Sequence, residues 1–450
     1  MKHTDIIRKL NLEQKCALLS GETVFTTRAL PGKGIPAITL SDGPNGVRKQ
    51  AGAADHLGLN PSVPATCFPT SSATACSWDE KLGEAVGEAL GEEAAAQEVA
   101  VLLGPGLNIQ RSPLCGRDFE YFSEDPILAG RMAAAYVRGI QKNGISACPK
   151  HFAVNSQELR RMASDSVLDE RTLRELYLTG FEIVVKEAKP KTIMTSYNLI
   201  NGTYANENAH LLQDILRKDW GFDGAVVTDW GGSNDHALGV KNGSTLEMPC
   251  PGGDSIRELM KAVQNGKISE ADVDARLDEM LELVLSTHAA VEKAPRTFDA
   301  AAHHKLARRA AAESIVLLKN EGGILPLKPN ERLAVIGDFA ETPRYQGAGS
   351  SAVNALQVDT LLDSIKADDS GITFVGYASG FERQGAAGAE KLEEAVALAK
   401  QADTVLLCLG LDELRESEGL DRADMKLAEN QQRLLAAVAA VNPNVVVLLS

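Results

Sequence analysis

The residues of this sequence that could do chemistry stand where short apolar runs end. Asp42 follows the run ITLS, Lys150 and His151 follow ISACP, and Asp229 and Trp230 follow GAVVT. If these runs are strands of one parallel barrel, their carboxyl ends meet at a single mouth. The candidate site then comprises Asp42, Arg48, Arg117, Lys150, His151, Arg161, Tyr197, Asp229 and Trp230. Cations beside a partly buried carboxylate hold it ionised, as a nucleophile requires.

Asp229 is the strongest candidate for a nucleophile, because it comes directly after an apolar strand and precedes Trp230. An aspartate at a strand end is also a common turn residue, so the cations of the neighbouring strands are what favour a catalytic role. The indole of Trp230 suits the apolar face of a sugar ring, and the alternative is a place in the core.

Lys150 and His151 allow two sharper alternatives. A lysine at the end of a barrel strand could form a Schiff base with a carbonyl substrate. The adjacent histidine and the arginines suit a pocket for hydroxyl groups equally well. His151 is a weak candidate for a metal ligand, since the sequence has no HExxH motif and no second histidine at ligand spacing.

A second carboxylate is expected from the acidic loop GLDELRESEGLDRADMKL. One of its carboxyl groups would lean over the barrel mouth as a proton donor, with a pKa raised by nearby carboxylates and burial. The candidates in this loop are Glu413, Glu416, Glu418 and Asp421. The alternative is a solvated acidic face. The run GAGSS at 347–351 lacks the GK[ST] ending of a phosphate loop and predicts a turn.

The elements that must position these residues form repeated βα units. Between residue 37 and about residue 290, short apolar runs alternate with longer helical patterns, which is typical of a parallel sheet. The clearest helices are expected within 79–98, 125–141, 169–188 and 269–288, each opened by Asp or Ser. This part of the chain fits a (β/α)8 TIM-like barrel.

A second α/β domain is expected after a break in the pattern at 289–302. A helix should run over 303–319, and further strands and helices alternate from 332 onwards. The apolar strand at 444–450 needs a covering element, so we expect this domain to continue beyond Ser450. The predicted division is 1–296 for the barrel, 297–312 for a linker and 313–450 for an α/β sandwich domain incomplete at its C-terminus.

Charge and composition disfavour several classes of partner. The 450 residues carry 46 Lys and Arg against 61 Asp and Glu, and the net charge of −15 repels nucleic acid and anionic membranes. The cysteines have no CxxC spacing and are expected to be free thiols. Residues 1–20 lack a secretory apolar core, and no later run is long enough to span a bilayer. We therefore expect a cytoplasmic location.

At these residues the sequence resembles glycoside hydrolase family 3, in its β-glucosidase-type branch. The motifs SDGPNGVR, GRDFEYFSEDP, KHFAVNSQE, TSYNLING, VVTDWGG, LLKNEGGILPL and ESEGLDR occur in the family's order. The resemblance implies a TIM-like barrel followed by an α/β sandwich, and retaining, exo-acting hydrolysis of terminal β-D-glucosyl residues. The implied partner is a small β-glucoside, and no metal or organic cofactor is implied. Asp118, Ser156 and Thr228 depart from the residues usual at their positions.

The resemblance also implies a role for each candidate residue. Asp229 would be the nucleophile, and Glu418 would be the acid/base, supplied by the second domain. The sugar would be bound by Asp42, Arg48, Arg117, Lys150, His151, Arg161 and Tyr197, with Trp230 as its platform. We expect Asp229 to be ionised among cations and Glu418 to be protonated beside acidic neighbours.

Several functions stay open at this point. Within the same class they are a β-xylosidase, a β-N-acetylhexosaminidase or another β-glycosidase, and Asp42 favours a glucose-like sugar because the family uses this aspartate on outer hydroxyls. Outside that class they are a catalytically incomplete sugar-binding fragment and a Schiff-base aldolase that uses Lys150.

Overall fold

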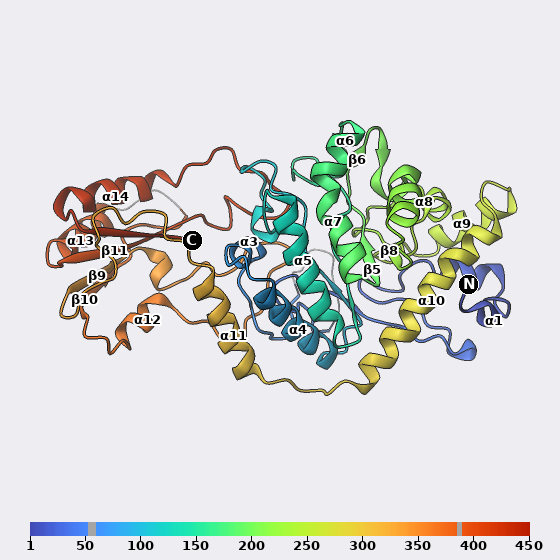
Figure 1. Ribbon diagram of the computed structural model, residues 1–450, viewed down its shortest axis with the longest axis horizontal. Coiled ribbons are helices and arrows are strands. Elements are labelled where there is room, and N and C mark those ends of the chain that lie inside the picture. The colour runs from blue at the N-terminus through green and yellow to red at the C-terminus, as the bar shows by residue number, and fades with distance from the viewer. Residues whose placement is uncertain (53–59, 385–388) are drawn as a thin grey trace. The chain divides into compact units, whose positions relative to one another are not determined.

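The computed structural model describes residues 1–52, 60–384 and 389–450 (Figure 1). The chain divides into two compact units. The barrel unit comprises Met1–Ile315, Ala348–Leu356 and Glu418–Leu420, and the sheet unit comprises Val316–Gly347, Gln357–Ser417 and Asp421–Ser450. Two short segments from late in the sequence therefore belong to the barrel unit. The domain boundaries expected at 296 and 312 stay a prediction.

Short parallel strands form the barrel. β1 (Leu40–Asp42), β2 (Val101–Leu103) and β3 (Ser146–Ala147) pair in that order, and β5 (Thr192–Met194) pairs with β8 (Ala225–Val227). Parallel bridges join Phe152 to Thr195 and Val227 to Leu246, which extends the ladder on both sides of β5 and β8. The side chains of β2, β5 and β8 are fully buried, as expected for parallel strands covered on both faces.

The segment around residues 19–27 closes this ring of strands. The Gly21 N–H donates to the Glu247 carbonyl (3.0 Å), and the Leu40 N–H donates to the Phe25 carbonyl (2.8 Å). Thr26 pairs antiparallel with Thr39. The predicted TIM-like barrel is confirmed as a fold class, and its ring includes an antiparallel segment.

Helices and short turns complete the barrel unit. They are α1 (Thr4–Ile7), α2 (Leu12–Ala17), η1 (Pro31–Lys33), α3 (Ser71–Ala75), α4 (Glu80–Ala96), η2 (Asp118–Glu120), α5 (Pro126–Gln141), α6 (Glu170–Thr172), η3 (Leu173–Leu178), α7 (Thr179–Ile183), η4 (Val184–Ala188), η5 (Ala205–Glu207), η6 (His210–Asp219), α8 (His236–Asn242), α9 (Asp254–Gln264), α10 (Glu270–Lys293) and α11 (Ala300–Glu313). A small sheet of β4 (Asp165–Ser166), β6 (Leu199–Ile200) and β7 (Thr203–Tyr204) lies apart from the ladder.

The helix starts follow the sequence signals. The side chains of Asp79, Asp125, Asp169 and Ser269 accept N–H groups in the first turns of α4, α5, α6 and α10, as predicted. α4 and α5 pack side by side (Figure 1), and a Cβ at Gly139 would overlap the Glu84 carbonyl oxygen. The expected helix at 303–319 was placed too late, because α11 begins at Ala300 and ends at Glu313.

The sheet unit contains one four-stranded parallel sheet in the order β10 (Thr373–Ala378), β9 (Arg332–Ile336), β11 (Thr404–Leu409) and β12 (Val445–Leu449). Its helical elements are η7 (Asp338–Ala340), α12 (Leu361–Lys366), α13 (Ala389–Ala399) and α14 (Glu429–Val441). α13 and α14 lie side by side (Figure 1). Leu434 and Val438 of α14 are fully buried in the core of this unit.

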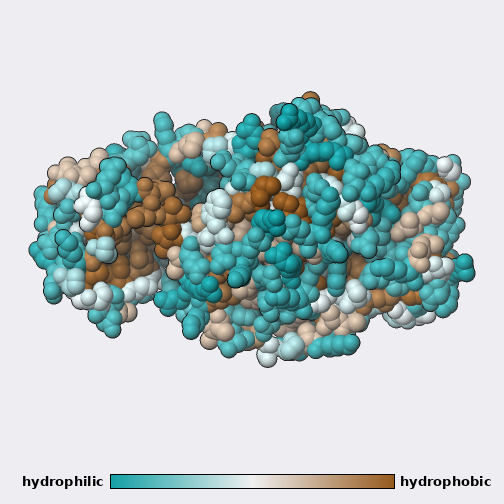
Figure 2. Space-filling view, viewed as in Figure 1, coloured by the Kyte–Doolittle hydropathy of each residue, from teal (hydrophilic) through white to brown (hydrophobic). Residues whose placement is uncertain are grey.

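The surface of the sheet unit carries much of the exposed apolar area. Figure 2 shows hydrophobic surface gathered where Figure 1 draws the strands β9 to β12. The exposed apolar residues of this unit include Val316, Leu317, Leu318, Val447, Leu448 and Leu449. In the part of the chain that the structure describes, no helix is both long and apolar enough to cross a membrane.

Candidate active site

The carboxyl ends of the barrel strands place several predicted site residues at one edge. Asp42 is the last residue of β1, Lys150 and His151 follow β3, Tyr197 follows β5, and Asp229 follows β8. Arg117 reaches the same place from the loop between β2 and α5, where the short turn η2 begins directly after it. Parallel strands that run in one direction thus bring side chains from distant parts of the sequence together.

A buried network of charges forms the floor of the site. Arg117, which is only 1% exposed, donates through Nε and Nη2 to Oε2 of Glu120, both at 2.8 Å. Lys150 Nζ lies 3.3 Å from Oε1 of the same carboxylate. Burial pushes the pKa of Glu120 up, but Arg117 and Lys150 outweigh it and leave that pKa lowered. Glu120 therefore holds both cations in place as an anion.

Asp229 has one carboxyl oxygen held and the other directed at His151. Oδ1 accepts the N–H of Trp230 at 2.7 Å, and Oδ2 lies 3.6 Å from His151 Nε2. Among the described residues, Oδ2 accepts no hydrogen bond. Burial raises the pKa of Asp229, and Arg117, Arg161 and Lys150 offset that effect only in part.

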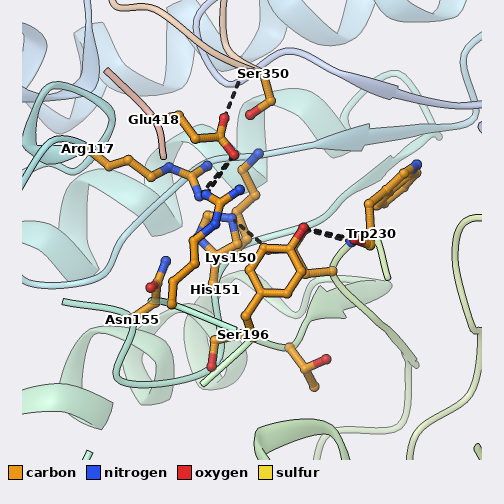
Figure 3. Close-up of polar contacts among 12 residues, drawn as sticks. Arg117, Lys150, His151, Asn155, Ser196, Trp230, Ser350 and Glu418 are labelled. Atoms are coloured by element: carbon orange, nitrogen blue, oxygen red, sulfur yellow. Dashed lines mark hydrogen bonds and ion pairs between the residues drawn. The ribbon is translucent and has the colours of Figure 1, made fainter. Parts of the chain in front are cut away.

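Glu418 is held by two arginines and by the backbone N–H of Ser350. Its Oε1 lies 2.9 Å from Arg161 Nη1 and 3.5 Å from Arg117 Nη1, and its Oε2 accepts the Ser350 N–H at 2.7 Å. Figure 3 shows Glu418 next to Arg117 and Ser350. Burial acts to raise the pKa of Glu418, but the two arginines and the Ser350 hydrogen bonds hold it well below its usual range.

The expected order of the two pKa values is therefore wrong in this structure. We expected cations to keep Asp229 ionised and acidic neighbours to keep Glu418 protonated. Burial instead dominates at Asp229, while the arginines dominate at Glu418. The acidic neighbours have other partners, since Glu413 pairs with Arg383 at 3.2 Å and Glu416 pairs with Arg344 at 3.1 Å, all within the sheet unit.

The GAGSS run, for which only a turn was predicted, forms a loop that contacts and positions Glu418. The Glu418 N–H donates to the Ala348 carbonyl at 3.0 Å. Gly349 has a φ of +115°, and a Cβ there would overlap the Glu418 side chain. Arg48, predicted to bind substrate, donates from Nη1 to the Gly349 carbonyl at 2.9 Å and so holds this loop.

Asp42 and His151 are both shifted by burial. Burial raises the pKa of Asp42 to about 6, although Lys150 and Arg48 act to lower it. Burial and the cations Arg117, Lys150 and Arg161 hold the pKa of His151 well below its usual value, so the imidazole is neutral. Its Nδ1 lies 3.3 Å from the hydroxyl of Tyr121, a residue that the sequence analysis did not single out.

Tyr197 and Trp230 line the site beside Asp229. The Tyr197 hydroxyl donates to the Trp230 carbonyl at 2.9 Å, and the Arg161 guanidinium lies 4.8 Å from the centre of the Tyr197 ring. The indole N–H of Trp230 donates to the Val24 carbonyl at 2.8 Å, and its ring packs against Phe25. The indole is thus fixed in position while remaining partly exposed.

Sequence reasoning missed residues that bind the predicted ones. Glu120, Tyr121 and Glu158 stand inside the motifs GRDFEYFSEDP and KHFAVNSQE, so their place in motifs that also carry predicted site residues was the available signal. The Thr228 hydroxyl, at a position noted as unusual, donates to the Met248 carbonyl at 3.1 Å and accepts the Met248 N–H. Within the described ranges, no three His, Cys, Asp or Glu side chains are grouped as metal ligands.

The fold and the site thus define a parallel α/β barrel with carboxyl groups and cations gathered at its strand ends, where barrel proteins carry their functional residues. Residues 53–283 match the glycosyl hydrolase family 3 N terminal domain, and residues 315–450 match the glycosyl hydrolase family 3 C-terminal domain. The chain belongs to glycosyl hydrolase family 3.

Curated relatives cover almost the whole chain. It is 46% identical over 447 residues to the thermostable β-glucosidase B of Acetivibrio thermocellus, a match that covers 99% of this chain and 59% of that enzyme. It is 45% identical over 460 residues to an exo-α-(1→6)-L-arabinopyranosidase of Bifidobacterium longum, with the same coverage of 99% and 59%. The chain thus spans about 59% of the length of these relatives.

Solved structures of the family have the same fold. The β-glucosidase of Bifidobacterium adolescentis superposes with a TM-score of 0.91 at 42% identity, covering 98% of this chain and 63% of that one. β-Glucosidase 3B of Thermotoga neapolitana, solved in complex with α-D-glucose, gives a TM-score of 0.89 at 33% identity, covering 100% of this chain and 69% of that one.

Proposed function

We propose that this chain is a retaining, exo-acting β-glucosidase that removes terminal β-D-glucosyl residues. The observation that carries the proposal is the setting of Asp229, a buried carboxylate at a barrel strand end with one oxygen held by the Trp230 N–H and the other facing His151. Membership of the family and similarity to several β-glucosidases support it.

In the first proposed step, Asp229 attacks the anomeric carbon of the sugar. The bond from that carbon to the leaving-group oxygen breaks, and Glu418 gives its proton to that oxygen. In the second step, the Glu418 carboxylate takes a proton from water, and the water oxygen displaces Asp229 from the anomeric carbon. The released sugar keeps its configuration because the carbon is inverted twice.

The low pKa of Glu418 means that the acid must gain its proton as substrate binds. Arg117 and Arg161 now direct donors at Glu418. Sugar hydroxyl groups that accept hydrogen bonds from these arginines would compete with the carboxylate for them, and its pKa would rise. The raised pKa of Asp42 and of Asp229 makes each of them a nearby source of the proton.

The hypothesis that Lys150 forms a Schiff base is disfavoured by the protonation of its amine. Burial lowers the pKa of this amine, but Glu120 and Asp42 outweigh burial and leave the pKa raised. A protonated amine lacks the lone pair that attacks a carbonyl. Borohydride treatment with a carbonyl substrate is therefore expected to leave Lys150 unmodified.

An α-L-arabinopyranosidase is the second candidate, because a relative with that activity is 45% identical over 99% of the chain. An α-L-arabinopyranoside lacks the hydroxymethyl group of glucose and carries an axial hydroxyl at C4. The ratio of kcat/KM for 4-nitrophenyl β-D-glucoside to that for 4-nitrophenyl α-L-arabinopyranoside separates the candidates. A ratio above 1 supports the β-glucosidase. A preference for the xyloside would instead identify a β-xylosidase, and a preference for the N-acetylglucosaminide would identify a β-N-acetylhexosaminidase.

Covalent labelling tests the proposal directly. A 2-deoxy-2-fluoro-β-glucoside with a dinitrophenolate leaving group should glycosylate Asp229. The fluorine slows both steps, whereas the activated leaving group speeds only the first, so the glycosyl-enzyme accumulates. Peptide mass mapping locates the label, and Asp229→Asn is the control that should neither be labelled nor turn over. Binding of glucosides without turnover would identify a sugar-binding protein, and a label on another carboxylate would overturn the assignment.

A further inference from the structure

Glu158 is a buried carboxylate with no role in the reaction described so far. It follows the strand segment that carries His151 and is 3% exposed. Its Oε2 accepts two hydrogen bonds, from Arg161 Nη1 at 2.7 Å and from the backbone N–H of Gly419 at 2.8 Å. Both donors belong to the immediate surroundings of Glu418.

The first donor links two carboxylates through one nitrogen. Arg161 Nη1 lies 2.7 Å from Glu158 Oε2 and 2.9 Å from Glu418 Oε1. A guanidinium shared in this way divides its charge between the two acids. Glu158 thus limits how strongly Arg161 binds Glu418.

The second donor fixes the backbone on which Glu418 stands. Gly419 is the next residue after Glu418, and both belong to the short segment Glu418–Leu420 that forms part of the barrel unit. Together with the bond from the Glu418 N–H to Ala348, the Gly419 bond holds this segment on both sides of the Glu418 side chain. Burying a carboxylate costs desolvation free energy, and well-placed partners such as these are needed to offset that cost.

We propose that Glu158 is a positioning residue for the acid/base Glu418, holding the backbone of Gly419 and sharing Arg161 with the Glu418 carboxylate. The inference rests on the proposed function in assigning the acid/base role to Glu418. The contacts of Glu158 themselves do not depend on that role.

The shared arginine gives Glu158 a second effect, on the proton of Glu418. If the charge of Glu158 is removed, Arg161 pairs with Glu418 alone and one nearby negative charge is lost, so the pKa of Glu418 falls further. The other titratable and charged groups that act on this carboxyl are Asp42, Arg117, Glu120, Lys150, Arg161, Tyr197 and Asp229. Of these groups, Arg117 and Arg161 also interact with Glu158, so a change at Glu158 reaches Glu418 through them as well as directly.

The two substitutions Glu158→Gln and Glu158→Ala separate the two effects. Glutamine keeps an oxygen that can accept the Gly419 N–H but removes the charge, whereas alanine removes both. We expect kcat/KM for cellobiose to fall roughly 10- to 100-fold in Glu158→Gln, and less than about threefold for dinitrophenyl β-glucoside, which needs little acid assistance. The alkaline limb of the cellobiose pH profile should move to lower pH.

Glu279→Gln is the matched control. Glu279 is also a buried carboxylate held by arginines, 2.9 Å from Arg217 and 2.8 Å from Arg276. The Thr245 hydroxyl donates to it at 2.7 Å, and none of these groups contacts Glu418. This variant should lower stability but leave the ratio of the two substrates and the pH limb unchanged. Equal losses on both substrates in Glu158→Gln, with an unshifted pH limb, would reduce Glu158 to a structural role and overturn the proposal.

Hydrogen–deuterium exchange gives a readout that does not depend on activity. Peptides that contain Gly419 should exchange at least about tenfold faster in Glu158→Ala than in the unmutated chain, because the Gly419 N–H loses its acceptor. Unchanged exchange there would overturn the positioning role. If exchange quickens but the unmutated chain cleaves no glucoside, the proposed function fails while the positioning of the Glu418 segment stands.

Discussion

Replacing Glu120 with glutamine should destabilise the barrel unit while leaving its shape intact. The Glu120 side chain is fully buried and is the shared partner of Arg117 and Lys150, themselves 1% and 2% exposed. Glutamine has nearly the same volume and can still accept a hydrogen bond, so no cavity forms. The change removes one negative charge and leaves two buried cations close together.

The expected cost is about 3 kcal/mol in the free energy of unfolding. Removing one partner of a buried ion pair typically costs roughly 3–5 kcal/mol, because a buried charge is left uncompensated. The lower end applies here, since Arg117 keeps Glu418 at 3.5 Å and Lys150 keeps the attraction of Asp42. For a unit of more than 300 residues, that loss corresponds to about 4 °C in Tm.

Tryptophan fluorescence during urea unfolding measures this change selectively. The 3 tryptophans, Trp78, Trp220 and Trp230, all belong to the barrel unit. Glu175→Gln is the control, because Glu175 forms an exposed pair with Arg171 at 3.0 Å and its loss should cost at most about 0.5 kcal/mol. A Glu120→Gln variant within about 1 kcal/mol of the unmutated chain would refute the idea that Glu120 balances both cations.

Three further predictions follow from single contacts. Gly349→Ala should lower kcat/KM for cellobiose at least about tenfold and affect dinitrophenyl glucoside much less, since a Cβ would displace Glu418; equal losses on both substrates would contradict this. Because the pKa of Asp42 is raised to about 6, KM for glucosides should rise as pH falls through that value, and Asp42→Asn should abolish this dependence; a pH-dependence that persists in the variant would rule Asp42 out. His303 pairs with Glu93 at 2.7 Å and Glu92 at 3.3 Å, which outweighs burial and raises its pKa. The stability that protonated His303 contributes should be complete below its unfolded pKa of about 6.5 and be lost as pH rises through the raised folded pKa. His303→Gln should therefore lower the free energy of unfolding by about 1.5–3 kcal/mol at pH 5.5 and by less at pH 9. An equal loss at both pH values in urea unfolding would show that the charge is irrelevant.

The strand ends and helix starts could be predicted from sequence because their signals are local. An apolar run followed by Asp229 or Lys150 marks a strand end, and Asp79 or Ser269 marks a helix start. The partners of Glu418 could not be predicted in the same way. They depend on a segment near residue 418 joining a loop near residue 349 in the barrel unit, and no local pattern encodes a contact of that sequence separation.

The pKa order could not be predicted because it depends on which carboxylate each arginine faces. The sequence analysis expected cations near Asp229 and acidic residues near Glu418, and both kinds of neighbour are present. The structure directs Arg161 at Glu158 and Glu418, while Asp229 receives one backbone N–H and the edge of a neutral imidazole. Burial then decides the pKa of Asp229, because no cation of the described residues pairs with it directly.

The site as a whole is better described by one shared proton than by two separate acids. Its carboxyl groups outnumber its cations: the acids are Asp42, Glu120, Glu158, Asp229 and Glu418, and the cations are Arg48, Arg117, Lys150 and Arg161. In such a cluster the apparent pKa values belong to the group, and a proton is held most readily by a carboxyl whose burial outweighs the nearby cations. In this structure the carboxyls of the cluster with a raised pKa are Asp42, Glu158 and Asp229, and arginines drawn away by a sugar would move a proton towards Glu418 as Asp229 becomes the anion. Substrate binding itself would thus set Asp229 and Glu418 in the charge states that the proposed function requires.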